Sequence, residues 1–71
     1  MSPLISAPIG SEVTVAKIAA DDKVKRRLED LGVLAGQPVT PIASLLGNTV
    51  LRVKESRLVI NHGLAERIYV N

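Results

Sequence analysis

His62 and Glu66 are the residues of this chain whose types and spacing could bind a metal. They lie four positions apart, so both side chains would share one face of a helical turn. An imidazole and a carboxylate suit a divalent transition metal such as Fe²⁺, with Asp21 and Asp22 as further carboxylates to consider. Because the chain has one histidine and no cysteine, it predicts at most a weak site or a site that bridges two chains. The alternative is an exposed histidine in a turn before Gly63.

A basic cluster is the second feature that could bind something, and it contains Lys23, Lys25, Arg26 and Arg27. On a helix these cations could bind an acidic surface of a partner protein or anionic lipid. The candidate partner-binding residues are Lys23, Arg26, Arg27 and Asp30. The simpler alternative is a solvated helix face held by pairs of opposite charge four residues apart, namely Asp22–Arg26, Lys25–Glu29 and Arg26–Asp30.

Other kinds of chemistry have little support in the sequence. The serines have only His62 as a possible base, and no glycine-rich loop is followed by the Lys-Ser/Thr of a phosphate-binding loop. We therefore expect no enzyme activity. Tyr69 is the only aromatic residue and the net charge is only +2, so we expect no nucleic-acid binding. A small-barrel nucleic-acid binder remains the third and least favoured class of function.

One helix must position the basic cluster. Asp21 or Asp22 offers an N-cap, and apolar residues at Val24, Leu28 and Leu31 predict one buried helix face. Gly32 then stands where a left-handed residue ends a helix, and Val33 could fold back onto Leu28.

The rest of the chain predicts about five short strands, at residues 12–18, 37–46, 49–54, 57–60 and 68–70. The alternation slips before Ile18, which indicates a bulge, and the two prolines in 37–46 place that strand at an edge or give it a bulge. Gly47-Asn48 and Glu55-Ser56 are the predicted turns, and residues 62–66 predict a short helical turn. Of Leu45 and Leu46, just before the first turn, we expect one to be exposed.

These elements predict a mainly β fold. Strands this short avoid long open edges by curling into a small barrel, here with one helix inserted after the first strand. Residues 1–10 read as an irregular N-terminal lead-in, partly ordered by Leu4 and Ile9, so the domain is expected to span 11–71. With 71 residues the chain makes one domain, and 46% hydrophobic residues can supply its core without disulfides. No membrane span and no leader are predicted, so we expect a cytoplasmic protein.

Three segments resemble the FeoA family of small proteins of bacterial ferrous iron transport. Residues 27–39, RLEDLGVLAGQPV, resemble the family's signature of a helix end, two glycines and a strand. The Gly47-Asn48 turn and the apolar residues after it, and the closing apolar residues from 58 to 70, match the rest of the pattern. The chain departs from the family at Ala35, where proline is usual, and at Glu55-Ser56, where a glycine is usual.

The resemblance implies an SH3-like β-barrel and a regulatory role. The implied partner is FeoB, the membrane transporter that carries a GTPase domain, with this chain as a monomer or weak oligomer bound to its cytoplasmic part. A related SH3-like domain stands at the C-terminus of iron-dependent repressors. That relationship implies the alternative function, a metal-responsive regulatory domain that binds a transition metal itself.

Overall fold

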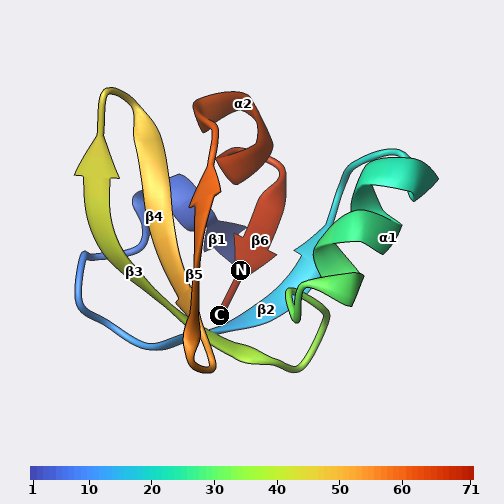
Figure 1. The fold of residues 1–71 in the computed structure, drawn as a ribbon, viewed down its shortest axis with the longest axis horizontal. Coiled ribbons are helices and arrows are strands. Elements are labelled where there is room, and N and C mark those ends of the chain that lie inside the picture. The colour runs from blue at the N-terminus through green and yellow to red at the C-terminus, as the bar shows by residue number, and fades with distance from the viewer.

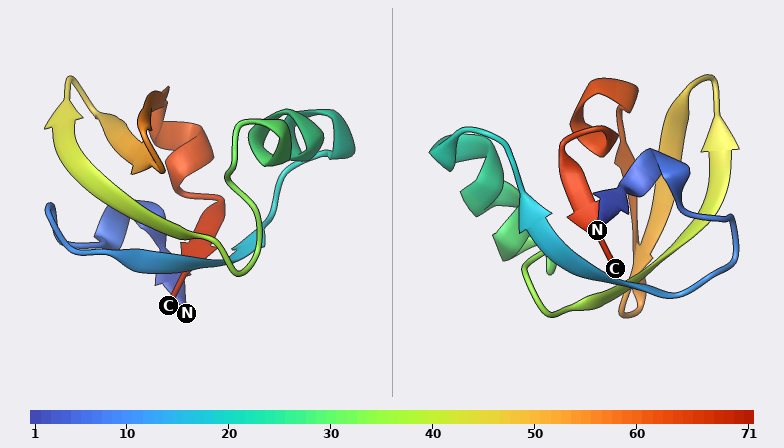
Figure 2. Two further views of the ribbon diagram at one scale, coloured as in Figure 1. Left: turned by 60° about the horizontal axis from the view of Figure 1, so that its bottom comes forward. Right: turned by 180° about the vertical axis from the view of Figure 1, so that it is seen from behind.

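Six strands form one antiparallel sheet, in the order β1-β6-β2-β3-β4-β5 (Figure 1). The computed structural model describes residues 1–71. The sheet curls, so that the strands and the short helices enclose a common interior (Figure 2). In chain order the elements are β1 (Ser2–Pro3), the 3-10 helix η1 (Leu4–Ser6), β2 (Val13–Ile18), α1 (Asp22–Asp30), β3 (Pro38–Leu45), β4 (Asn48–Val53), β5 (Ser56–Ile60), α2 (His62–Ala65) and β6 (Ile68–Val70).

The core of the fold is aliphatic. Thr49 is the only polar side chain among the buried residues. No helix is long and apolar enough to span a bilayer. The buried hydrophobic residues come from every part of the chain and are Leu4, Val15, Ile18, Leu28, Val33, Val39, Leu51, Val53, Ile60, Ala65, Ile68 and Val70.

The two predicted irregularities of the strands are present. The pairing of β2 with β6 shifts between Val15 and Lys17, which confirms the bulge predicted before Ile18. The pairing of β3 with β4 shifts between Pro41 and Ala43. Because β3 lies between β2 and β4, neither proline is at a sheet edge: Pro41 lies at this bulge, and Pro38 is the first residue of the strand.

The turn after β3 lies one residue earlier than predicted. Leu45 pairs with Asn48, so the turn residues are Leu46 and Gly47. Both take left-handed φ values, +53° and +83°, as in the type I′ turns that match the twist of a two-residue hairpin. The next turn is also one residue earlier, at 54–55, and Lys54 takes a φ of +57°. The left-handed position that usually favours glycine is therefore filled by a lysine.

The predicted helix is confirmed as α1, with Asp21 as its N-cap. The Val24 N–H donates to the Asp21 carboxylate at 2.9 Å, which satisfies one of the free donors of the first turn. Leu28 is buried and Val24 is half-buried, as the spacing predicts. Leu31 is 48% exposed, so its prediction as a core residue is wrong. It is the C-cap of α1, and its N–H still donates to the Arg27 carbonyl at 3.2 Å, so the chain leaves the helix only at Gly32.

The predicted end of α1 at Gly32 is confirmed. Gly32 has a φ of +98°, its N–H donates to the Glu29 carbonyl at 3.0 Å, and the Val33 N–H donates to the Leu28 carbonyl at 2.9 Å. This pair of bonds is the Schellman arrangement. It directs the chain into the core, where Val33 is fully buried.

The N-terminal residues are more ordered than the sequence suggests. β1 pairs with β6, and Leu4 is only 1% exposed. The expectation of an irregular lead-in over residues 1–10 therefore differs from the structure, because Leu4 fills the core while Ile9 stays 55% exposed. The added strand makes six strands in place of about five, and α1 follows the second strand.

Candidate functional site

The short helix α2 positions the predicted metal candidates. Its N-cap is Asn61, whose side-chain oxygen accepts a hydrogen bond from the Leu64 N–H at 2.8 Å. Asn61 was not among the predicted residues, although asparagine before a helical turn is a typical capping signal. This cap fixes the turn on which residues 62 and 66 lie one above the other.

His62 and Glu66 do share one face of this turn, as predicted. The His62 Nε2 atom lies 2.9 Å from the Glu66 Oε1 atom, and the two side chains are 61% and 52% exposed. The two atoms that a metal would need therefore already contact each other at the surface. Solvent weakens such an exposed pair, so it contributes little to stability.

His62 and Glu66 have no third metal-binding side chain beside them. No group of three histidine, cysteine or acidic side chains comes together anywhere in residues 1–71. Asp21, considered above as a further ligand, caps α1 instead. The residues present fit a two-ligand exposed site and do not fit a closed tetrahedral site.

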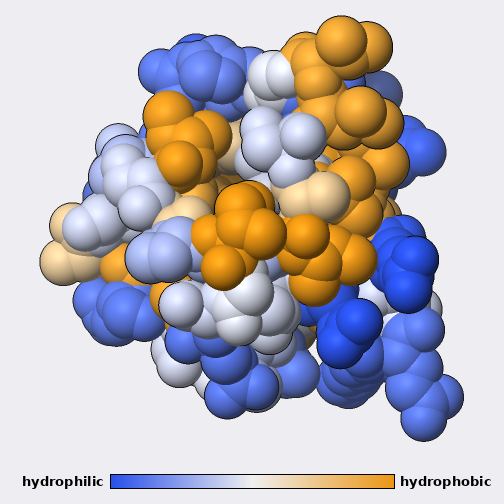
Figure 3. All heavy atoms as spheres, turned by 90° about the vertical axis from the view of Figure 1, so that its left-hand side faces the viewer, coloured by the Kyte–Doolittle hydropathy of each residue, from blue (hydrophilic) through white to orange (hydrophobic).

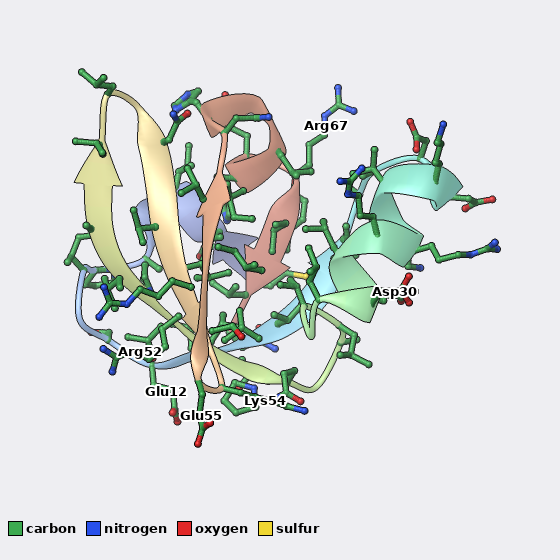
Figure 4. The ribbon with its side chains drawn as sticks, in the orientation of Figure 1. Glu12, Asp30, Arg52, Lys54, Glu55 and Arg67 are labelled. Carbon is green, nitrogen blue, oxygen red and sulfur yellow. The ribbon has the colours of Figure 1, made fainter.

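The predicted partner-binding residues do come together. Lys23, Arg26, Arg27 and Asp30 border one shallow hollow along α1, with Asp22 and Val24. The three pairs of opposite charge expected along the helix do not form ion pairs, since His62–Glu66 is the only ion pair in the structure. Asp30 points away from the sheet (Figure 4). The charged ends on α1 are therefore exposed and available to a partner.

An apolar groove lies between α1 and β5. It has a volume of about 220 Å³. Leu31 borders this groove, which explains its exposure at the end of the helix. The other bordering residues are Val24, Arg27, Leu28, Leu58, Val59, Ile60 and Leu64.

The tip of the β3–β4 hairpin is apolar and exposed. Leu45 is 62% exposed and Leu46 is 95% exposed. One of them was predicted to be exposed, and the structure places both at the surface. The reason is the earlier turn, which moves Leu46 out of the strand and onto the tip.

Comparison with known proteins identifies the family. Residues 2–71 match the family model of the FeoA domain. The chain belongs to the FeoA family. A FeoA-family relative from Methanocaldococcus jannaschii, named as an Fe(2+) transport protein A, is 36% identical over 70 residues, which is 99% of this chain and 85% of that protein.

Solved structures place this FeoA-family chain among SH3-like folds. The zinc complex of Stenotrophomonas maltophilia FeoA, described as a prokaryotic SH3 domain protein, superposes with a TM-score of 0.85 at 23% identity, covering 100% of this chain and 91% of that one. A manganese-dependent transcriptional repressor superposes with a TM-score of 0.83 at 21% identity, covering 96% of this chain and 39% of that one. These likenesses concern the fold, and they confirm the predicted SH3-like barrel, a fold that this repressor shares.

Proposed function

We propose that this chain is a non-enzymatic accessory protein of ferrous iron transport. It acts in the cytoplasm by binding the cytoplasmic part of an FeoB-type membrane GTPase transporter. Membership of the FeoA family carries the proposal. The Stenotrophomonas maltophilia relative is described as a candidate activating factor of bacterial ferrous iron transport.

The mechanism is differential binding. A protein that binds one conformational state of a transporter more tightly than another shifts the equilibrium between those states. The shift is set by the difference between the two binding free energies and cannot exceed it. The exposed charges on α1 give this chain a surface for such binding. Its only imidazole contacts Glu66 and not a serine, which favours a binding role over nucleophilic catalysis.

Co-purification tests the proposal directly. We expect the full chain to be retained by an FeoB-type transporter in detergent, and ferrous iron uptake to change when the gene is deleted. Unchanged uptake together with no retention contradicts the proposed function.

Charge reversal on α1 is expected to weaken that binding. The double variant Arg26→Glu/Arg27→Glu removes two exposed cations that border the α1 hollow. We expect a loss of affinity of about tenfold at low salt and a smaller loss at high salt, because exposed charges are screened. Lys17→Glu/Arg67→Glu, with the same change in net charge elsewhere on the surface, is the control. Equal affinities of the two variants would exclude α1 as the contact.

Weak metal binding is the second candidate function. It rests on the 2.9 Å contact between His62 and Glu66 and on the zinc complex of the S. maltophilia relative. Titration calorimetry with Zn²⁺, Mn²⁺ and anaerobic Fe²⁺ is expected to show binding only at high micromolar metal, because two exposed ligands hold a cation loosely. His62→Gln should abolish the heat, and Glu12→Gln should not. Absence of heat from the unmodified chain ends this candidate for the isolated protein.

A further inference from the structure

The register of β3, β4 and β5 sorts their side chains into an inner and an outer face. On β4 the residues Thr49, Leu51 and Val53 are buried, so Val50 and Arg52 point outward. On β5 Val59 lies opposite Val50, and Arg57 lies opposite Arg52. The three strands form a meander whose outer face meets solvent.

Six residues make up what we call the outer meander surface. Its apolar side chains lie near the hairpin tip, and its cationic side chains follow at a spacing of two residues along the strands, or about 7 Å. Figure 3 shows one side of the molecule with hydrophobic side chains gathered from the upper edge to the centre and hydrophilic ones along the lower edge. The six residues are Leu45, Leu46, Val50, Val59, Arg52 and Arg57.

The arginine pair works against the stability of the sheet. Arg52 and Arg57 are directly opposite one another on neighbouring strands, where like charges repel. Neither forms an ion pair, although Glu12 and Glu55 lie at the same end of the barrel as Arg52 (Figure 4). Two guanidinium groups side by side are suited to bind carboxylates in a bidentate way.

The apolar side chains of this surface are also unfavourable for the stability of the isolated chain. Leu46 is 95% exposed and holds a left-handed φ of +53°, a conformation that glycine or asparagine adopts more easily. Val59 is 68% exposed on the same face as Val50. Backbone strain and exposed apolar side chains that cluster in one place are typical of surfaces that bind a partner.

We infer that the outer meander surface is a docking site for a protein segment that presents apolar side chains next to carboxylates. The inference rests on the proposed function, in that the segment belongs to the cytoplasmic part of the transporter. Apolar side chains of the partner would cover Val50, Val59 and the leucines. Its carboxylates would lie about 7–13 Å further along, over Arg52 and Arg57.

Charge complementarity favours such a partner over a second copy of this chain. The strands β3, β4 and β5 contain no aspartate and no glutamate. A symmetric dimer through this face would therefore bring arginine pairs into an interface without carboxylates from the partner strands. An acidic, amphipathic segment removes the repulsion and covers the apolar side chains at once.

The test measures the affinity of the full chain for the cytoplasmic part of the transporter, together with the Tm of each variant. Arg52→Glu/Arg57→Glu should weaken binding at least tenfold. Its Tm should fall only slightly, since one like-charge pair replaces another and the new carboxylate at position 52 lies at the same end of the barrel as Glu12 and Glu55. Arg52→Gln alone should weaken binding and raise Tm, because it removes the repulsion from Arg57 without adding a carboxylate near Glu12 and Glu55. Val59→Thr, a polar replacement of similar shape, should also weaken binding with the fold intact.

The control is Lys17→Glu/Arg67→Glu, which changes the net charge equally and should bind the transporter at least tenfold more tightly than Arg52→Glu/Arg57→Glu. If the unmodified chain binds and the three meander variants bind as well as it does, the docking surface is excluded and the proposed function stands. If the unmodified chain does not bind, the proposed function falls and the docking surface falls with it.

Discussion

Replacing Gly32 by alanine is expected to lower the free energy of unfolding by about 2–5 kcal/mol, from a strained backbone and an overpacked core together. The backbone contributes because Gly32 has a φ of +98°, where a Cβ is unfavourable. The packing contributes because that Cβ would lie 2.9 Å from Val53 Cγ1. Val53 is buried and β-branched, so it cannot easily rotate away.

A loss of this size is large for the chain. Domains of 71 residues have total stabilities of about 4–11 kcal/mol. Urea unfolding followed by circular dichroism measures the change, with the m-value checked for a two-state transition.

Gly36→Ala separates the two contributions. Gly36 has a φ of +90°, and no atom lies within 4 Å of the position that its Cβ would take. The Gly36→Ala variant should therefore lose only the backbone contribution, about 1–2 kcal/mol of the free energy of unfolding. Equal losses at Gly32 and Gly36 would contradict the close approach of the helix end to β4.

Local signals predicted α1 and its ends correctly. Asp21, Gly32 and Val33 act through bonds to residues three to five positions away, so neighbours in the sequence determine them. The same holds for His62 and Glu66, whose contact needs only one helical turn. These features of the candidate site could be found without knowing the fold.

Features that depend on strand register could not be found in this way. The turn predicted at Gly47-Asn48 would place Leu46 in the ladder opposite Thr49, whereas the structure pairs Leu45 with Asn48. Moving a turn by one residue shifts each cross-strand partner by two positions, so the same side chains face solvent but their neighbours differ. The turn predicted at Glu55-Ser56 would place Arg52 opposite Val59. The pairing of Arg52 with Arg57, and with it the outer meander surface, therefore appears only in the structure.

Burial of the N-terminal residues also depends on distant partners. Pro3 and Pro8 made residues 1–10 look irregular, and the sequence suggested Leu4 and Ile9 alike as residues that order them, without distinguishing the one that enters the core. The place of Leu4 in the core follows from the pairing of Ser2 and Pro3 with the last strand, at the opposite end of the chain. The FeoA-domain match begins at residue 2, in agreement with this pairing.

Leu4→Ala is therefore expected to lower the free energy of unfolding by about 2–4 kcal/mol, as truncation of a buried leucine does. Leu4 is 1% exposed, and its carbonyl accepts a hydrogen bond from the Ala7 N–H at 3.0 Å, which holds the 3-10 turn against the core. Ile5→Ala is the matched control, because Ile5 is adjacent but 41% exposed and should lose less than about 1 kcal/mol. Urea unfolding of the two variants decides the matter. A negligible loss at Leu4 would mean that residues 1–10 are the independent lead-in that the sequence suggests, whereas the expected contrast makes them an integral segment of the barrel.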